Sequence, residues 1–293
     1  MSARIRVFFS LLLTPLLLIQ MGCETPFNLQ ITAGQSQVTV NPDQQVCNPF
    51  GGGSSAGRNH GLKAKLSYAP SNATVHPQVL GDFLTMGTPV NVDLFFNDVF
   101  VPTRPFDSGF LTQAGNVLTT PNGDTLYEWF RIDFESNVVL GSSDPVGKYQ
   151  FALMSDDGSL LKIKEFGQYN ILVNNDRTTS SSLKCASRSV EMNASTMVPI
   201  QLGYFQGPRY HIALAVLWRQ VPANLSPADE ALFMVDQACD TYGNGQFFDS
   251  TQNPPAPSSV WNGMMSRGWK VLKSENYLLP GTTVNPCDAP IGI

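Results

Sequence analysis

The sequence of 293 residues has little charge, few histidines and no extended basic segment. Charged residues make up 14% of the chain, and only three histidines occur. Nucleic-acid binding needs clustered cations, so nucleic acid is not expected as a partner. No Cys-x-x-Cys spacing is present, and the few histidines therefore do not complete a common zinc motif.

The motifs of well-known enzyme classes are also missing. The chain has no His-Glu-x-x-His and no phosphate-binding loop. Glycoside hydrolysis needs two carboxylates placed across a bond, and nothing singles out such a pair among Asp133, Glu135, Asp156 and Asp157. The sequence therefore predicts a protein that is not an enzyme, and a hydrolase of unrecognised type is the most distant alternative.

The N-terminal residues predict export. Arg4 and Arg6 precede an apolar run, residues 7–19, which is short for a membrane span but suits a signal peptide. The run leads to Gly22-Cys23, which resembles a bacterial lipoprotein signal, although Gln20 departs from the usual apolar residue. An ordinary signal peptide with a stray cysteine is the alternative.

The lipoprotein resemblance implies a location as well as a modification. We expect residues 1–22 to be removed and Cys23 to carry the lipid, including palmitate. Glu24, in place of an aspartate, points to the outer membrane or cell surface of a Gram-negative bacterium. Loss of residues 1–22 moves the formal net charge from −5 to −7, because two arginines leave with them.

Four further cysteines remain after Cys23. An even number in an exported chain predicts two disulfides. Three connectivities are open. We favour Cys47–Cys287, which joins the two ends, with Cys185–Cys239 closing an internal loop.

The middle of the chain predicts a single β-domain. Residues 23–58 are polar and include Gly51-Gly52-Gly53-Ser54-Ser55, so we expect a flexible tether there. Short runs with alternating apolar residues then recur between turn residues, without long helical patterns. These runs begin near Leu62, Val90, Phe130, Tyr149, Leu161, Val198 and Ile212. We assign residues 59–220 to an antiparallel β-sandwich or barrel.

Residues 221–293 lack the regular alternation of the preceding segment and predict a partly helical extension. Ser226-Pro227 followed by Asp229 and Glu230 is a typical helix start, and a second short helix is expected from Ser259 to about Gly268. The segment has too little apolar periodicity to fold alone. We expect it to pack on the sandwich.

The most informative stretch is residues 147–163. Two alternating runs flank a tight turn that holds Asp156 and Asp157. The alternation predicts one face of each strand in a core and the other in water, with the turn projecting from the rim. Adjacent carboxylates repel each other, so water, a cation or the donors of a ligand must offset the repulsion. An Asp-Gly hairpin turn without further role is the alternative.

This stretch also resembles a known family. Gly147-Lys148-Tyr149-Gln150-Phe151, followed by Ser155-Asp156-Asp157-Gly158-Ser159-Leu160, is similar to the central signature of the PA-14 (protective-antigen-type) β-domain. Residues 174–176, 198–204 and 211–218 fit the same family. The similarity covers roughly residues 60–220 and implies a β-sandwich fold. Family members include fungal adhesins that bind sugars through calcium.

The resemblance implies specific site residues. In the adhesins the paired aspartates are joined by a cis peptide and hold calcium, so Asp156 and Asp157 would be the calcium ligands. The adhesins add an asparagine from the loop after the tyrosine-ending strand, where this chain has Gln206. Further ligand contacts would come from Asn174, Asn175, Asp176, Arg209 and Tyr210, of which the first three are alternatively plain turn residues.

Two main hypotheses follow from the sequence. The first is an envelope lipoprotein whose sandwich binds carbohydrate, with calcium (Ca2+) as cofactor. The second is a structural or protein-interaction module of the envelope without metal or sugar, whose partner is another envelope protein. Stabilisation by calcium separates them.

Overall fold

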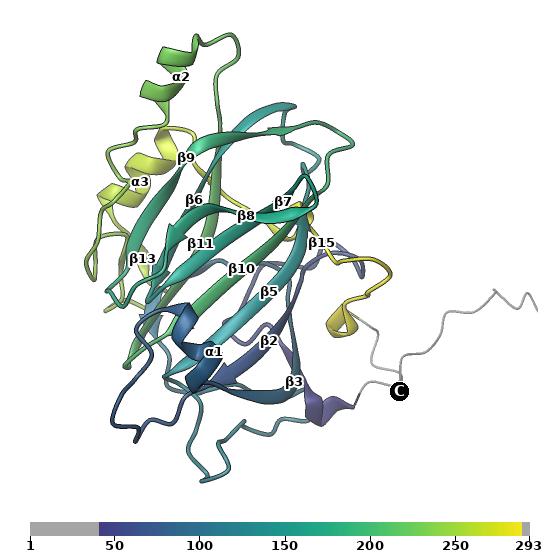
Figure 1. The fold of residues 1–293 in the computed structure, drawn as a ribbon, viewed down its shortest axis with the longest axis vertical. Helices are drawn as coiled ribbons and strands as arrows, with labels where there is room; N and C mark the ends of the chain where they lie inside the picture. The colour runs from purple at the N-terminus through teal and green to yellow at the C-terminus, as the bar shows by residue number, and fades with distance from the viewer. Residues whose placement is uncertain (1–40, 289–293) are drawn as a thin grey trace, which may run out of the picture. The chain divides into compact units, whose positions relative to one another are not determined.

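The computed structural model describes residues 41–288, and two packed β-sheets dominate this range (Figure 1). The expected signal peptide and the lipid-bearing Cys23 lie outside the described residues. None of the helices found between residues 41 and 288 has the length and apolar character needed to cross a bilayer.

The first sheet has eight strands and is antiparallel except where β1 pairs with β3. Figure 1 shows β3, β2, β5, β10, β7 and β8 side by side in this order. Its strands are, in spatial order, β1 (Gln45–Cys47), β3 (Thr88–Phe96), β2 (Leu62–Tyr68), β5 (Phe130–Val138), β10 (Val198–Gln206), β7 (Ser159–Glu165) and β8 (Gln168–Asn175), with β15 (Tyr277–Leu278) paired to β5.

The second sheet has five strands: β14 (Lys270–Val271), β11 (His211–Gln220), β6 (Gly147–Asp156) and β9 (Ser182–Met192), with β4 (Val101–Pro105) paired to β11. β12 (Phe248–Asp249) and β13 (Ala256–Pro257) form a separate pair. The helices are α1 (Phe83–Met86), α2 (Pro227–Phe233) and α3 (Ser259–Ser266), with short 3-10 turns η1 (Pro42–Gln44), η2 (Leu80–Asp82), η3 (Ser274–Asn276) and η4 (Pro286–Asp288).

The main core lies between the two sheets. Leu62, Ala64 and Leu66 of β2 are buried in it, while the residues between them are less covered, as the alternation predicts. Phe151 of β6 and Trp218 of β11 enter the same core from the second sheet. Apolar faces of two sheets packed in this way define a β-sandwich, and the predicted all-β class is confirmed.

The second sheet is buried on both faces, which corrects the prediction of one wet face. All of β11 from Ile212 to Arg219 is buried. Its outer face packs with β6 residues against Phe247, Trp261 and Trp269 of the C-terminal segment. Figure 1 shows α3 beside this sheet. The near-continuous apolar run of β11 is therefore typical of a strand covered twice, not of one that faces water.

The N-terminal part of the domain begins earlier than expected. The tether predicted for residues 23–58 is wrong from residue 45 on, because β1 pairs with β3 and Phe50 is buried in the main core. Both favoured disulfides are present: Cys47–Cys287 ties β1 to the C-terminal segment, and Cys185–Cys239 ties β9 to the segment after α2.

Candidate functional site

The turn between β6 and β7 carries the two adjacent acids. Asp156 ends β6, and β7 begins at Ser159, so the turn is as tight as its sequence predicts. The peptide bond between Asp156 and Asp157 is cis. Both side chains are buried, with 6% and 4% of their residue surface exposed. The acids therefore do not project into solvent, because the loops that follow β8 and β10 cover them.

Hydrogen bonds from two neighbouring segments, the loop after β8 and the loop after β10, hold the two carboxylates. Oδ2 of Asp156 accepts from the backbone N–H (3.1 Å) and the hydroxyl (3.2 Å) of Ser181. Asp157 accepts from the backbone N–H of Thr179 at Oδ1 (2.9 Å) and of Gly207 at Oδ2 (2.7 Å). All of these donors are neutral. The acids are thus oriented by the fold but receive no counter-charge from it.

Burial without a cation raises the pKa of both acids. Burial and the neighbouring Asp157 charge raise the pKa of Asp156 to about 7, against the smaller effect of the Ser181 hydrogen bonds. Burial raises the pKa of Asp157 to about 6, although two backbone N–H groups favour its charged form. Over residues 41–288, neither carboxylate takes part in an ion pair. A bound cation would supply the missing charge.

A pocket of about 250 Å³ opens beside the two acids. Its walls come from the loop after β8, the loop between β10 and β11, and the C-terminal segment. The residues that line it are Asp156, Asp157, Thr178, Thr179, Ser180, Pro208, Arg209, Tyr210, His211 and Asn244. The pocket therefore combines carboxylates, hydroxyl groups, an amide, a guanidinium group and an aromatic ring.

Gln206 does not take the place predicted for it. Its Oε1 accepts from the hydroxyl of Tyr204 (2.8 Å), and its Nε2 donates to the carbonyl of Pro208 (3.2 Å). The Tyr204 hydroxyl also donates to the carbonyl of Asp156 (2.6 Å). The amide of Gln206 thus braces the loop, because the hydroxyl of Tyr204 in the same strand and the carbonyl of Pro208 both bind it. Gln206 does not line the pocket.

The structure places the side chains of residues 174–176, predicted as ligand contacts, in hydrogen bonds within the protein. Asn174 accepts from the backbone N–H of Asp176 (3.0 Å), which is a turn interaction. Asn175 is buried and donates to the hydroxyls of Ser155 and Ser182, both at 2.9 Å. Asp176 accepts from the backbone N–H of Leu80 (2.8 Å). These side chains fix the loop that covers the acids, and none of them lines the pocket.

Arg209 and Tyr210 are placed at the pocket, as the resemblance implies. The peptide bond between them is cis. Tyr210 is 53% exposed and stacks on the ring of His211 with 4.4 Å between ring centroids. Two aromatic residues of the neighbouring strands, Tyr204 and Trp218, are buried in the core instead.

Asn244 is one of the pocket residues that the sequence analysis did not predict. It belongs to the C-terminal segment, 87 residues beyond Asp157, and reaches the pocket because Gly243 donates its backbone N–H to the carbonyl of Ser181 (2.9 Å). Its only local signal is the turn sequence Gly243-Asn244-Gly245. His211 also lines the pocket, and its Nε2 contacts the hydroxyl of Ser250 at 3.2 Å.

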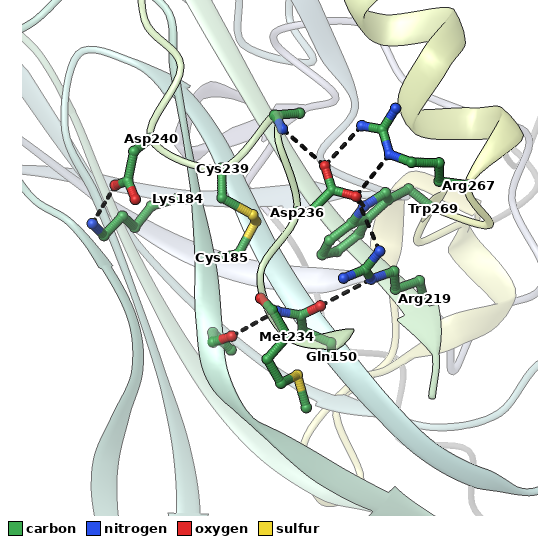
Figure 2. Close-up of a disulfide and its surroundings, with 12 residues drawn as sticks. Gln150, Lys184, Cys185, Arg219, Met234, Asp236, Cys239, Asp240, Arg267 and Trp269 are labelled. Atoms are coloured by element: carbon green, nitrogen blue, oxygen red, sulfur yellow. Dashed lines mark hydrogen bonds and ion pairs between the residues drawn. A yellow bond between two sulfur atoms is a disulfide. The ribbon is translucent and has the colours of Figure 1, made fainter. Parts of the chain in front are cut away.

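A second set of buried charges lies between the second sheet and the C-terminal segment (Figure 2). Asp236 accepts from Arg219 (3.0 Å), from Arg267 (2.7 and 2.8 Å) and from the indole N–H of Trp269 (3.2 Å). Gln150 of β6 accepts from Nε of Arg219 (2.9 Å). Burial raises the pKa of Asp236, but the hydrogen bonds from Arg267, from the backbone N–H of Ala238 and from Trp269 outweigh it and lower the pKa to about 2.

No protein-family model matches the sequence, and no curated protein matches it. Among solved structures, the chain is similar to the PA14 domain of the antifreeze protein MpAFP, with 16% identity and a TM-score of 0.40 over 56% of this chain and 84% of that one. It is also similar to a PA14 sugar-binding domain from an RTX adhesin (14% identity, TM-score 0.39, 55% and 90% covered). A third similar structure is the Epithelial Adhesin 9 A domain of Candida glabrata in complex with Galβ1-4GlcNAc (13% identity, TM-score 0.35, 63% and 90% covered).

Proposed function

We propose that the chain is a carbohydrate-binding, adhesin-like protein of the cell envelope, and that its ligand binds at the pocket beside Asp156 and Asp157 through a calcium ion. One observation carries the proposal: two adjacent carboxylates are buried and oriented by neutral donors, and no cation of residues 41–288 pairs with them. Buried carboxylates that keep their charge need a cation or a metal.

The pocket residues fit a cation that prefers oxygen ligands. Oδ1 of Asp156 accepts no hydrogen bond from residues 41–288, and Asn244 lines the same pocket. Calcium takes 6–8 oxygens, so Asp156, Asp157 and Asn244 leave room for water and for ligand hydroxyls. In the part of the chain that the structure describes, no three His, Cys, Asp or Glu residues gather around one point. This composition suits calcium better than zinc.

The remaining lining suits a sugar. Thr178, Thr179 and Ser180 offer hydroxyl and backbone groups for hydrogen bonds, and the exposed ring of Tyr210 offers an apolar surface. A bound calcium ion presents open coordination positions that vicinal sugar hydroxyls can fill. A PA14 domain named as sugar-binding and an adhesin domain in complex with a disaccharide are among the similar structures, in keeping with this ligand class.

The anchoring to the envelope forms a separate part of the proposal. Cys23, after the apolar run, would carry the lipid and hold the sandwich at the outer membrane. We expect the mass of the N-terminal peptide of the protein isolated from membranes to include the acyl groups, and Cys23→Ser to release the protein from the membrane fraction. An unmodified Cys23 in the membrane-derived peptide would contradict this part and leave the pocket untouched.

Calcium-dependent thermal unfolding tests the metal site. We expect millimolar calcium to raise the melting temperature of the wild type, since a ligand that binds only the folded state stabilises it. Asp156→Asn combined with Asp157→Asn should abolish the shift. The matched control is Asp124→Asn, because Asp124 is an exposed turn acid that is distant in sequence and does not line the pocket.

A glycan array probed with and without a chelator tests the sugar. We expect binding that calcium supports and the chelator removes, and that the double variant lacks. Absence of both the calcium shift and glycan binding would sink the proposal and leave the interaction-module alternative.

A further inference from the structure

Arg209 brings a positive charge to the pocket that already holds the two acids. It lies in the four-residue loop between β10 and β11 and lines the pocket together with Asp156 and Asp157. Its backbone N–H donates to Oε2 of Glu128 (3.0 Å), and its guanidinium carbon lies 4.4 Å from the ring centroid of Tyr127. The backbone of Arg209 is thus held by Glu128, and its side chain is held by Tyr127.

The guanidinium group of Arg209 has no acidic partner within residues 41–288. The arginines that pair with carboxylates there are Arg131, Arg188, Arg219 and Arg267. No side-chain nitrogen of Arg209 donates a hydrogen bond to another described residue, and Glu128 accepts only from its backbone. Five N–H donors in a planar fork therefore remain for a ligand. Carboxylate and sulfate groups match that fork.

The charge balance of the pocket favours an anionic ligand. The two carboxylates cancel the charge of a divalent ion, so the charge of Arg209 is left over beside the ligand. Arg177 stands in the adjoining loop after β8, next to the lining residues Thr178 and Thr179, with its guanidinium 5.9 Å from the ring of Tyr242. It also lacks a carboxylate partner in the described range. Glu128 is an opposing acid beside this loop, since it accepts the backbone N–H of Arg209.

We infer that the pocket selects acidic glycans: the metal holds sugar hydroxyls, and Arg209 binds a carboxylate or sulfate of the same ligand by paired hydrogen bonds. The inference rests on the proposed function and names its substrate class. Arg209 acts as a specificity-determining residue. Stacking on Tyr127 orients its guanidinium group and leaves the N–H groups available to a ligand. A neutral glycan leaves that fork unused.

The test compares two ligands that share their ring hydroxyls and differ in their acid groups. Isothermal titration calorimetry of the full chain in millimolar calcium compares tetragalacturonate, whose carboxylates are charged, with its neutral methyl ester. We expect the acid to bind about tenfold more tightly than the ester, which corresponds to about 1.4 kcal/mol. A sulfated galactose oligosaccharide and its desulfated form separate the sulfate source from the carboxylate source.

Two variants assign the preference to Arg209. Arg209→Gln should bring the acid-to-ester ratio close to one, while Arg209→Lys, which keeps the charge but loses the fork, should give an intermediate ratio. Arg58→Gln is the matched control, because it removes the same charge from an exposed side chain that does not line the pocket. It should keep the wild-type ratio.

The outcomes distinguish the inference from the function on which it rests. Equal binding of acid and ester by the wild type, for both the carboxylate and the sulfate pair, would overturn the inference and leave carbohydrate binding intact. A preference that survives in Arg209→Gln would overturn the role of Arg209. Binding of none of the four glycans, together with no calcium shift, would overturn both.

Discussion

The molecule buries acids in two places and treats them in opposite ways. Asp236 is 5% exposed and meets two guanidinium groups and an indole N–H (Figure 2). Asp156 and Asp157 are equally buried but meet only backbone N–H groups and a hydroxyl. The pKa of Asp236 is lowered to about 2, whereas those of Asp156 and Asp157 are raised to about 7 and 6.

The difference separates a structural charge cluster from a candidate binding site. At Asp236 the fold provides the counter-charge, and the result joins β11, α3 and the segment after α2. At Asp156 and Asp157 the fold provides orientation and access to a pocket but no cation. A site whose charge is completed from outside is one that can respond to a ligand.

The largest expected effect comes from substituting Asp236, the acid shared by Arg219, Arg267 and Trp269. Asp236→Asn leaves the guanidinium of Arg219, whose side chain is 5% exposed, buried without its partner. Removing one member of a buried ion pair costs about 3–5 kcal/mol. Urea unfolding should show this loss in the free energy of unfolding. A loss below about 1 kcal/mol would mean that Asp236 contributes no more than an exposed ion pair does.

The pH dependence of stability should have opposite signs at the two sites. The folded-state pKa values of Asp156 and Asp157 are raised, so the stabilisation from their protonation is complete below about pH 4 and is lost as the pH rises through about 6 to 7. Metal-free protein should therefore lose roughly 2–4 kcal/mol between about pH 5 and pH 8.

The double variant tests whether the two acids cause this pH dependence. With Asp156→Asn and Asp157→Asn, the free energy of unfolding should no longer fall between about pH 5 and pH 8. Saturating calcium should offset the fall in the wild type. Asp236 has a lowered pKa, so its stabilisation is present above about pH 4 and is lost only as the pH falls toward about 2. Chemical unfolding at a series of pH values measures both, and a wild-type profile that matches the double variant would refute the charge argument.

A single substitution at the site of Asp156 and Asp157 should stabilise the metal-free protein. Asp156→Asn keeps the shape and an oxygen acceptor for Ser181 while removing a buried charge that nothing pairs. At about pH 8 without calcium, we expect the free energy of unfolding to rise by roughly 1–3 kcal/mol. The same variant should lose most of the calcium response. Destabilisation at that pH would instead point to a structural need for the carboxylate.

The smallest effect is expected at Asp240, an exposed acid in the same segment as Asp236. Lys184 and Asp240 form an ion pair whose side chains are 44% and 67% exposed (Figure 2). Exposed pairs contribute at most about 1 kcal/mol, so Asp240→Asn should lower the free energy of unfolding by less than that. This variant is also the matched control for Asp236→Asn, because both acids belong to the same segment. A large effect at Asp240 would show that the whole segment, not the buried charge, limits stability.

The strands that the sequence predicted are those with regular alternation. β2, β3, β5, β6, β7, β10 and β11 all coincide with such runs. β4, β8 and β9 were missed for separate reasons. β4 contains two prolines and lies beside only one partner, β11. β8 is an edge strand with a mostly exposed first half, and β9 pairs with β6 through an irregular register that breaks the alternation.

The sequence alone determined the all-β class, the hairpin that places two acids at one turn, and the four cysteines available for pairing. These features depend on near neighbours in the chain, where periodicity and turn residues act. Only the tertiary structure decided that the acids are buried, that Tyr204 consumes the amide of Gln206, and that Asn244 and Arg209 meet at the pocket. Burial and counter-charge are set by segments distant in sequence. The same residue type is therefore paired with arginines at Asp236 and has no charged partner among residues 41–288 at Asp156 and Asp157.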